Sequence, residues 1–442
     1  MATTKPLVLL DPHPRTRAMI FSDDDWSRLA RMADVVGSEA GPVDTAIVDE
    51  CLPRVCVIVG QTPMPEARLR QAVALRAIFN VEGNFLPNVD YAFCLRSGIR
   101  VAVAAPAFAA PVAEHALALT LDLLRGVTRA DRAFRDGREE YGWRGNVGAA
   151  TLFDADVGVV GLGNIGRALL PLLAPFRCRV RVHDPWLPDA VIRERGAVPA
   201  TLDELFACSN VVIVAAAPTR DNRGAIGAAQ FARMRQGSKL VLISRADVMD
   251  FAALKEVVAS GRIEAALDVF PQEPVAADDP IRSMPGMLLS SHRAGGLDSA
   301  LKTIGAMVVD DLDLVLRGLP PVRLQSAQPE TVGLQCSRPG LDAASTTMST
   351  SRARKTIRRS GAAANAGMNR KRCAPRRIAS GCCRWACAAA TSWASRSSRS
   401  SIRGATCRHA MRICASAPKP SSAAYGRRAD FRSSFPRCRS AK

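Results

Sequence analysis

The chain has 442 residues, with 60 Lys and Arg against 41 Asp and Glu, and a formal net charge of +19. The excess is confined to one end, because 24 Lys and Arg but only 2 Asp follow Gln335, so that residues 1–335 are slightly acidic. This distribution excludes a protein whose folded body attracts nucleic acid through a basic surface. A membrane span is not expected either, because the apolar region at 99–124 is interrupted by two prolines, Glu114 and His115.

The cysteines divide in the same way as the charge. Five lie in the first 335 residues, at positions without paired spacing, and eight follow. Scattered, unpaired cysteines are typical of reduced thiols, so a cytoplasmic protein is expected. The apolar run near the N-terminus is too short for a signal peptide.

The first 106 residues alternate between predicted strands and helices. Strands are predicted at 6–10, 55–60, 75–81 and 99–104, with helices at 65–73 and 87–97 between them. This alternation indicates a small parallel α/β domain. A long apolar helix predicted at 111–129 would join it to the following part of the chain.

The strongest motif of the chain lies at 157–166. An apolar strand at 157–160 leads into Gly161, Gly163 and Gly166, and Asn164 and Ile165 open a predicted helix. In this strand–turn–helix context, G-x-G-x-x-G predicts a dinucleotide site whose pyrophosphate lies at the helix N-terminus. The next predicted strand ends at Asp184, where a carboxylate accepts the ribose hydroxyls of NAD and repels the 2′-phosphate of NADP. NAD is therefore the predicted cofactor.

The alternation continues to about residue 317. Thr201 and Glu204 form a capping box before a short helix, and strands are predicted at 210–215, 239–244, 264–270 and 287–292, with a helix at 250–260. A last helix at 297–317 is expected to pack back on the first domain. The predicted division is a substrate domain at 1–106, completed by the helix within 293–330, a Rossmann NAD-binding domain at 107–292, and a tail at 331–442.

Three side chains at predicted strand ends suit hydride transfer between NAD and a 2-hydroxy acid. His292 is a natural proton shuttle, Arg245 can grip a carboxylate with two hydrogen bonds, and Glu273 can orient the imidazole. Asp268 is placed to accept from the nicotinamide carboxamide. Each residue alone has an ordinary structural interpretation, but together at successive strand ends they predict an active site.

With these residues the chain resembles the D-isomer-specific 2-hydroxyacid dehydrogenases, over its length to about residue 330. The matching segments are Val112-Ala-Glu-His115, the glycine turn ending at Gly166, His183-Asp-Pro185, Ser244-Arg245, the segment from Ala266 to Pro274, and the segment from Ser291 to Gly296. The resemblance implies two doubly wound parallel-sheet domains, one flavodoxin-like and one Rossmann.

The resemblance also implies roles for individual residues. Arg245 would bind the substrate, His292 would be the acid/base and Glu273 would support it. The backbone N–H groups of Glu82 and Gly83 would hold the substrate carboxylate. A small 2-keto or 2-hydroxy acid is the implied partner, and a homodimer the implied assembly.

The chain departs from the family pattern in two places. It has Leu242-Ile-Ser-Arg245-Ala246 where many members have Asn-x-x-Arg-Gly, and the bulky Phe85 and Leu86 follow Gly83 in the substrate loop. The family's formate dehydrogenases carry an amide at the position of Glu273, so that branch is disfavoured. A nucleotide sensor or corepressor that keeps the NAD site with little turnover is the alternative function, and turnover on a panel of keto acids would discriminate between them.

The tail from residue 331 has a different composition, rich in Ser, Arg, Ala and Cys and poor in aliphatic residues. Such a composition cannot bury a core, which predicts a disordered segment. An out-of-frame translation of a GC-rich gene would give the same bias. No metal site is predicted, because the cysteines at 382–387 lack a second ligand cluster. The tail would attract nucleic acid only nonspecifically, and no function is assigned to it.

Overall fold

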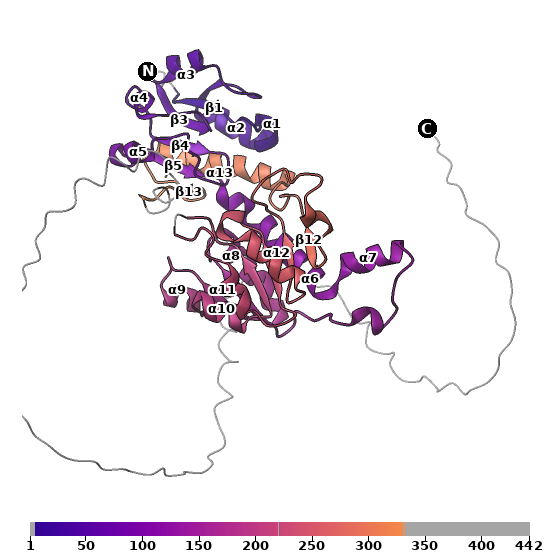
Figure 1. Cartoon of the computed structure of the whole chain (residues 1–442). Helices are drawn as coiled ribbons and strands as arrows, with labels where there is room; N and C mark the ends of the chain where they lie inside the picture. The colour runs from indigo at the N-terminus through magenta and orange to yellow at the C-terminus, as the bar shows by residue number, and fades with distance from the viewer. Residues whose placement is uncertain (1–4, 220, 330–331, 333–442) are drawn as a thin grey trace, which may run out of the picture. The chain divides into compact units, whose positions relative to one another are not determined.

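The computed structural model describes residues 5–219, 221–329 and 332. They form two lobes, each built on one sheet with helices on its faces (Figure 1). Nearly all of the predicted tail, and with it the predictions of disorder or of an out-of-frame origin, lies outside the described residues.

The first lobe has a six-stranded sheet in the order β13-β5-β4-β3-β1-β2. Its strands are β1 (Leu7–Asp11), β2 (Asp34–Gly37), β3 (Val55–Gly60), β4 (Ala77–Asn80), β5 (Arg100–Val103) and β13 (Gln325–Ser326). The order of β1 to β5 is flavodoxin-like, as expected, and all of these strands are parallel. The two-residue β13 pairs antiparallel with β5; it was not predicted, because two residues carry no periodicity.

The helices of this lobe are α1 (Arg17–Ile20), α2 (Asp23–Met32), α3 (Thr45–Cys51), α4 (Glu66–Leu69), α5 (Tyr91–Ser97) and α13 (Asp298–Leu316). The helices α4 and α5 are shorter than the predictions at 65–73 and 87–97, and α1 to α3 were not predicted. The predicted return of the last helix is confirmed: Ile304 and Val308 of α13 lie in one core with Val8 and Phe79 of the sheet. Figure 1 shows α13 lying along this lobe.

The second lobe has a seven-stranded, fully parallel sheet in the order β12-β11-β10-β9-β6-β7-β8. Its strands are β6 (Asp156–Val160), β7 (Arg179–His183), β8 (Val198–Pro199), β9 (Val211–Val214), β10 (Lys239–Leu242), β11 (Glu264–Leu267) and β12 (Met287–Leu289). From β8 to β11 this is the Rossmann order, with the switch point between β6 and β9. The continuous apolar runs are buried on both faces, as a parallel sheet requires.

Seven helices and several 3₁₀ turns complete the second lobe. The helices are α6 (Ala109–Arg125), α7 (Val127–Arg135), α8 (Asn164–Leu173), α9 (Asp189–Glu194), α10 (Leu202–Cys208), α11 (Ala228–Arg233) and α12 (Phe251–Ala259), of which α6 joins the lobes. The 3₁₀ turns are η1 (Ala105–Phe108), η2 (Arg144–Asn146), η3 (Ala174–Phe176), η4 (Ala246–Val248) and η5 (Pro280–Ser283), the last two near the strand ends. The capping box of Thr201 and Glu204 is confirmed at the start of α10.

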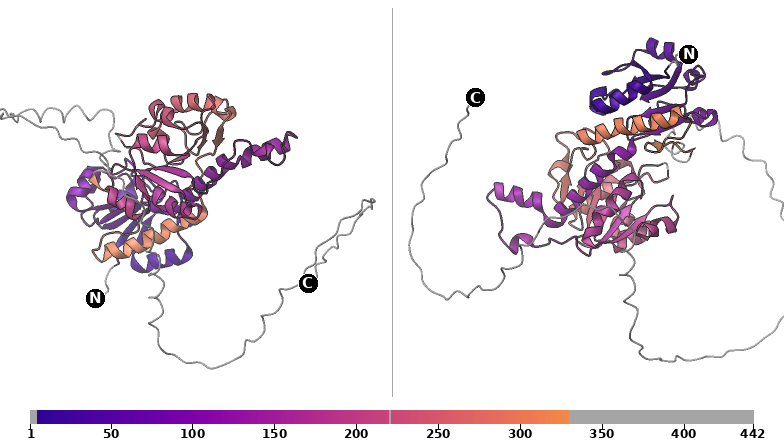
Figure 2. Two further views of the ribbon diagram at one scale, coloured as in Figure 1. Left: turned by 90° about the horizontal axis from the view of Figure 1, so that it is seen from below. Right: turned by 180° about the vertical axis from the view of Figure 1, so that it is seen from behind.

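The joining helix ends earlier than predicted. Gly126, with φ +64°, adopts the left-handed conformation that stops α6, and α7 then begins in a new direction. The helical segment at 105–125 is long and apolar enough to cross a membrane by composition alone. In this fold it is a core helix, because Val112, Ala116 and Leu119 pack with the sheet of the second lobe. In both views of Figure 2, α7 extends away from this lobe.

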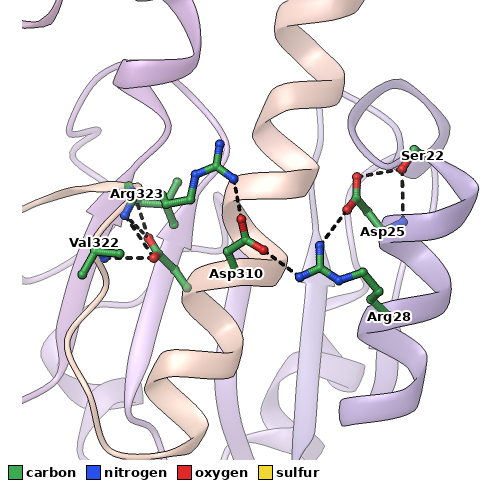
Figure 3. A network of polar contacts seen from close by, with 8 residues as sticks. Ser22, Asp25, Arg28, Asp310, Val322 and Arg323 are labelled. Atoms are coloured by element: carbon green, nitrogen blue, oxygen red, sulfur yellow. Dashed lines mark hydrogen bonds and ion pairs between the residues drawn. The ribbon is translucent and has the colours of Figure 1, made fainter. Parts of the chain in front are cut away.

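A polar network links α13 to α2 and to the segment that follows α13 (Figure 3). Asp310 on α13 accepts a 2.6 Å hydrogen bond from Arg28 of α2 and a second one from Arg323. Burial opposes ionisation of Asp310, but the hydrogen bonds from the two arginines keep the pKa of its carboxyl below the ordinary value. Its neighbour Asp311 is fully buried and accepts from the backbone N–H groups at 322–324.

The Asp310 network predicts a pH-dependent contribution to stability. Because the folded-state pKa lies below the unfolded one, the contribution is present above about pH 4 and is lost as the pH falls through the folded value. Asp310→Asn is expected to lower the free energy of unfolding by about 1 kcal/mol at pH 7. Urea unfolding at pH 7 and near pH 2 measures the difference, which should shrink at the lower pH.

Asp313→Asn is the matched control, because Asp313 pairs with Arg317 inside the same helix and bridges no other element. A loss for Asp310→Asn that is equal at both pH values would contradict the electrostatic explanation.

Candidate active site

The glycine turn after β6 has the geometry that a dinucleotide requires. Gly161 has φ +90°, and a Cβ there would lie 2.6 Å from the Cα of Ala216. A Cβ at Gly166 would lie 2.3 Å from the carbonyl oxygen of Gly161. At Gly163 a Cβ would meet nothing within 4 Å. The first and third glycines thus allow the turn and the close packing of helix and strand, and the second leaves open space for a pyrophosphate.

The N-terminus of α8 adds donors to this space. Gly163 is its N-cap and offers no side chain to the first turn, so the N–H groups there are left for a ligand. Asn164 turns its side-chain amide to the other lobe, where it donates to Gln325 Oε1 at 2.6 Å. Ile165 packs against the core of the lobe. The backbone N–H groups of these two residues, rather than their side chains, are therefore the groups available to a phosphate.

Asp184 directly follows β7, beside this turn. Its Oδ2 accepts from the N–H of Leu162 at 2.7 Å, and its Oδ1 from the N–H of Trp186 at 3.0 Å. Each carboxylate oxygen keeps further acceptor capacity, and the side chain is half-buried rather than enclosed. An acidic side chain tied to the glycine turn fits the ribose hydroxyl groups of NAD as an acceptor. The residues present therefore fit a bound NAD.

His292 and Glu273 form a hydrogen-bonded pair. His292 Nδ1 lies 2.6 Å from Glu273 Oε2, and Glu273 Oε1 accepts from the N–H of Phe270 at 2.8 Å. A carboxylate fixed in this way selects the tautomer with the proton on Nδ1, so Nε2 is the nitrogen left to exchange a proton. The imidazole is 43% exposed, which leaves it accessible to a substrate.

Asp268 holds the loop that carries His292. It comes directly after β11, not within the strand as predicted, and is 1% exposed. Its carbonyl accepts from the N–H of His292 at 2.7 Å, and its carboxylate accepts from the N–H groups of Arg293 and Ala294 at 3.1 and 3.2 Å. His292 has φ +48°, an uncommon conformation for a residue with a side chain, and these bonds maintain it. The predicted role toward the nicotinamide stays a prediction.

His115 on α6 touches the same region, although no chemical role is predicted for it. Its Nε2 lies 3.1 Å from Ser290 Oγ and 3.6 Å from Asp268 Oδ1. One imidazole therefore contacts the ends of β11 and β12, the two strands that lead to Glu273 and His292. The only signal in the sequence was that His115 belongs to one of the segments that match the family.

Arg245 follows β10 and is largely enclosed by protein. Its Nη1 donates to the carbonyl of Ser244 at 2.7 Å. Burial lowers the pKa of its guanidinium from the ordinary value, while the charges of Glu273, Asp247 and Glu82 act in the opposite direction. Arg245 is therefore a cation within electrostatic reach of the acid of the His292 pair and of the substrate loop.

The substrate loop after β4 presents backbone donors. Among the described residues, the N–H groups of Glu82 and Gly83 have no acceptor, whereas the carbonyl of Glu82 accepts from Ala104. The Glu82 side chain forms a two-bond ion pair with Arg15, at 2.9 and 2.7 Å. Arg15 was not predicted, because nothing near it in the sequence pairs it with a residue 67 positions away.

Comparison with known proteins agrees with this geometry. Residues 117–294 match the family model for the D-isomer specific 2-hydroxyacid dehydrogenase, NAD binding domain. The structure of a phosphoglycerate oxidoreductase from Rhizobium etli is similar with a TM-score of 0.67 and 43% identity, over 73% of this chain and 99% of that one. A glyoxylate reductase of Korarchaeum cryptofilum is 30% identical over 53% of this chain and 71% of its own length.

A D-3-phosphoglycerate dehydrogenase of Archaeoglobus fulgidus is 29% identical over 277 residues, which are 62% of this chain and 52% of that protein. The chain spans about half the length of the phosphoglycerate dehydrogenases that it matches. The identity, the nearly complete coverage of the Rhizobium structure and the two parallel-sheet lobes lead to one conclusion. The chain belongs to the D-isomer-specific 2-hydroxyacid dehydrogenase family.

Proposed function

We propose that the protein is an NAD-dependent oxidoreductase that interconverts a small 2-keto acid and the corresponding D-2-hydroxy acid. The observation that carries the proposal is the His292–Glu273 pair, at the strand ends of a lobe whose glycine turn fits NAD. The proposed division of work gives substrate binding to residues 1–106 with 293–330, and NAD binding to residues 107–292.

When bound, NADH supplies the hydride for the carbonyl carbon of the keto acid. The substrate carboxylate lies against Arg245 and the free N–H groups of Glu82 and Gly83. His292 Nε2 gives a proton to the keto oxygen, and Glu273 stabilises the ring in both of its protonation states. In the oxidative direction His292 takes the proton of the hydroxyl group.

We further propose a cytoplasmic location and no nucleic-acid partner. The five cysteines of the described residues are free thiols, three of them buried, which suits a reducing compartment. The slightly acidic charge of residues 1–335 gives no surface for phosphate backbones.

We also propose a homodimer in which α7 and the segment after it are covered by a second copy. None of the residues of α7 is buried. Phe134 on α7 is exposed, as are Tyr141 and Trp143 after it, Trp143 by 82%. A nine-residue helix is marginal in isolation, so an apolar partner surface would account for both its order and its exposed aromatic side chains.

His292→Ala is expected to lower kcat on keto acids by about a hundredfold or more, because no other group takes over proton transfer. NADH affinity should stay nearly unchanged. The measurements are NADH oxidation with glyoxylate, hydroxypyruvate, pyruvate and longer 2-keto acids, and NADH binding by fluorescence. Comparable turnover in the variant would remove His292 from the mechanism, and no NADH binding by the wild type would refute the proposed function.

Arg245→Ala is expected to raise the KM for the keto acid by about tenfold to a hundredfold, because a charge-assisted hydrogen-bonded contact to the carboxylate is lost. Steady-state kinetics at saturating NADH measure it. Arg233→Ala is the control, since it removes an exposed cation of the same lobe that pairs only with Asp203. An unchanged KM in Arg245→Ala would contradict its assigned contact.

The double substitution Phe134→Asp and Trp143→Asp is expected to convert a dimer to a monomer, since two charges would be buried in the interface. Sedimentation velocity measures the change. Val73→Asp changes an equally exposed apolar residue of the first lobe and should leave the assembly unaltered. A wild-type monomer, or a dimer that persists in the double variant, would argue against this interface.

A further inference from the structure

Three polar side chains converge at the carboxyl edge of the first sheet. Arg15 follows β1, Gln61 follows β3, and Glu82 follows β4. In the strand order, β1 and β3 are the neighbours between which the connections change direction. Ligands of open α/β sheets bind outside the carboxyl ends of the strands at this switch point. The cluster therefore lies where the first lobe is expected to meet a substrate.

The Arg15–Glu82 pair is enclosed and has good geometry. Both carboxylate oxygens of Glu82 accept from the guanidinium, and the side chains are only 17% and 25% exposed. Gln61 Nε2 adds a longer bond of 3.4 Å to the same carboxylate. Gln61 Oε1, by contrast, is buried without a donor. Glu82 thus neutralises the charge of Arg15, and Gln61 Oε1 remains as an uncharged acceptor without a donor.

Packing keeps Arg15 in this position. Its guanidinium carbon lies 5.5 Å from the centre of the Phe108 ring, a cation–π contact. The ring itself is confined, because a Cβ at Gly83 or at Gly295 would lie 3.2 Å from it. Arg15 could turn to another anion only by giving up both the aromatic contact and the two bonds to Glu82.

Glu82 also faces the proposed substrate carboxylate. Its backbone N–H is one of the free donors of the loop, and its side chain acts electrostatically on Arg245. In a substrate held by these groups, the carbons beyond the keto group lie close to the Glu82 carboxylate, both oxygens of which already accept from Arg15. Glu82 would repel a second negative charge on those carbons, and Arg15, the cation of the cluster, is already paired.

We propose that Glu82, by neutralising Arg15, selects 2-keto acids with a single negative charge and rejects those with a distal phosphate or carboxylate. This inference rests on the proposed function and specifies its substrate class. A short, uncharged tail with a hydroxyl group suits the site, because Gln61 Oε1 lacks a donor. Glu82 is thus a specificity-determining residue whose side chain acts separately from its backbone N–H group.

The test compares hydroxypyruvate with its 3-phosphate ester, which differ only in the phosphate. For the full-length wild type, kcat/KM with NADH should be at least about tenfold higher for hydroxypyruvate. In Glu82→Gln, which keeps the shape of the side chain, the ratio should shift by at least about tenfold toward the ester, because Arg15 becomes available to it. Adding Arg15→Met should remove that gain.

Glu66→Gln is the matched control, since Glu66 accepts two exposed hydrogen bonds from Arg70 within the α4 segment and has no contact with Arg15 or Glu82 among the described residues. It should leave the ratio unchanged. NADH binding and the midpoint of thermal unfolding verify that each variant is folded, and the wild-type ratio tests the idea without any variant. A wild type that prefers the ester, or an unchanged ratio in Glu82→Gln, would overturn the proposed selectivity alone. Absence of turnover on every keto acid would overturn the proposed function with it.

Discussion

The arrangement of the site depends on one buried carboxylate. Asp268 receives three backbone N–H groups of a single loop, two on its side chain and one on its carbonyl, and so keeps His292 in a left-handed conformation. A carboxyl group that is 1% exposed would be costly to bury without such donors. The hydrogen bonds offset both the burial of the Asp268 carboxyl group and the backbone strain at His292. Without them, neither the direction of the imidazole nor its bond to Glu273 would be defined.

His115 extends this constraint to the helix that joins the lobes. Its ring contacts Ser290 and approaches Asp268, so α6 is tied to the ends of the strands that lead to His292 and Glu273. The residue before α6 is Phe108, whose ring fills the space beside Gly83 and Gly295. Side chains at one connecting element therefore lie against the loop of Gly83 in the first lobe and the loop that carries His292 in the second.

The sequence predicts what is local and periodic. The glycine turn at 161–166, the capping box at Thr201 and the apolar parallel strands follow from spacing alone, because the backbone conformation and burial they need are set within a few residues. Helix ends were less predictable: α6 stops at Gly126, since its left-handed conformation overrides an apolar pattern that continues. The strand β13 and the Arg15–Glu82 pair depend on contacts between distant segments, which no local pattern contains.

The site residues follow the same rule. Arg245, Glu273 and His292 could be proposed from the sequence because each follows a recognisable strand, and parallel strands end at one edge. Their mutual geometry, and the second use of Glu82, required the structure. The three charged groups of the proposed site differ in their partners. Glu273 is hydrogen-bonded to His292 and Glu82 is paired with Arg15, whereas Arg245 donates only to a backbone carbonyl and is the group proposed to bind a carboxylate. Under the proposed function, this arrangement leaves Arg245 as the cation of this set for one substrate charge, and a second substrate charge would meet Glu82, which is already paired with Arg15.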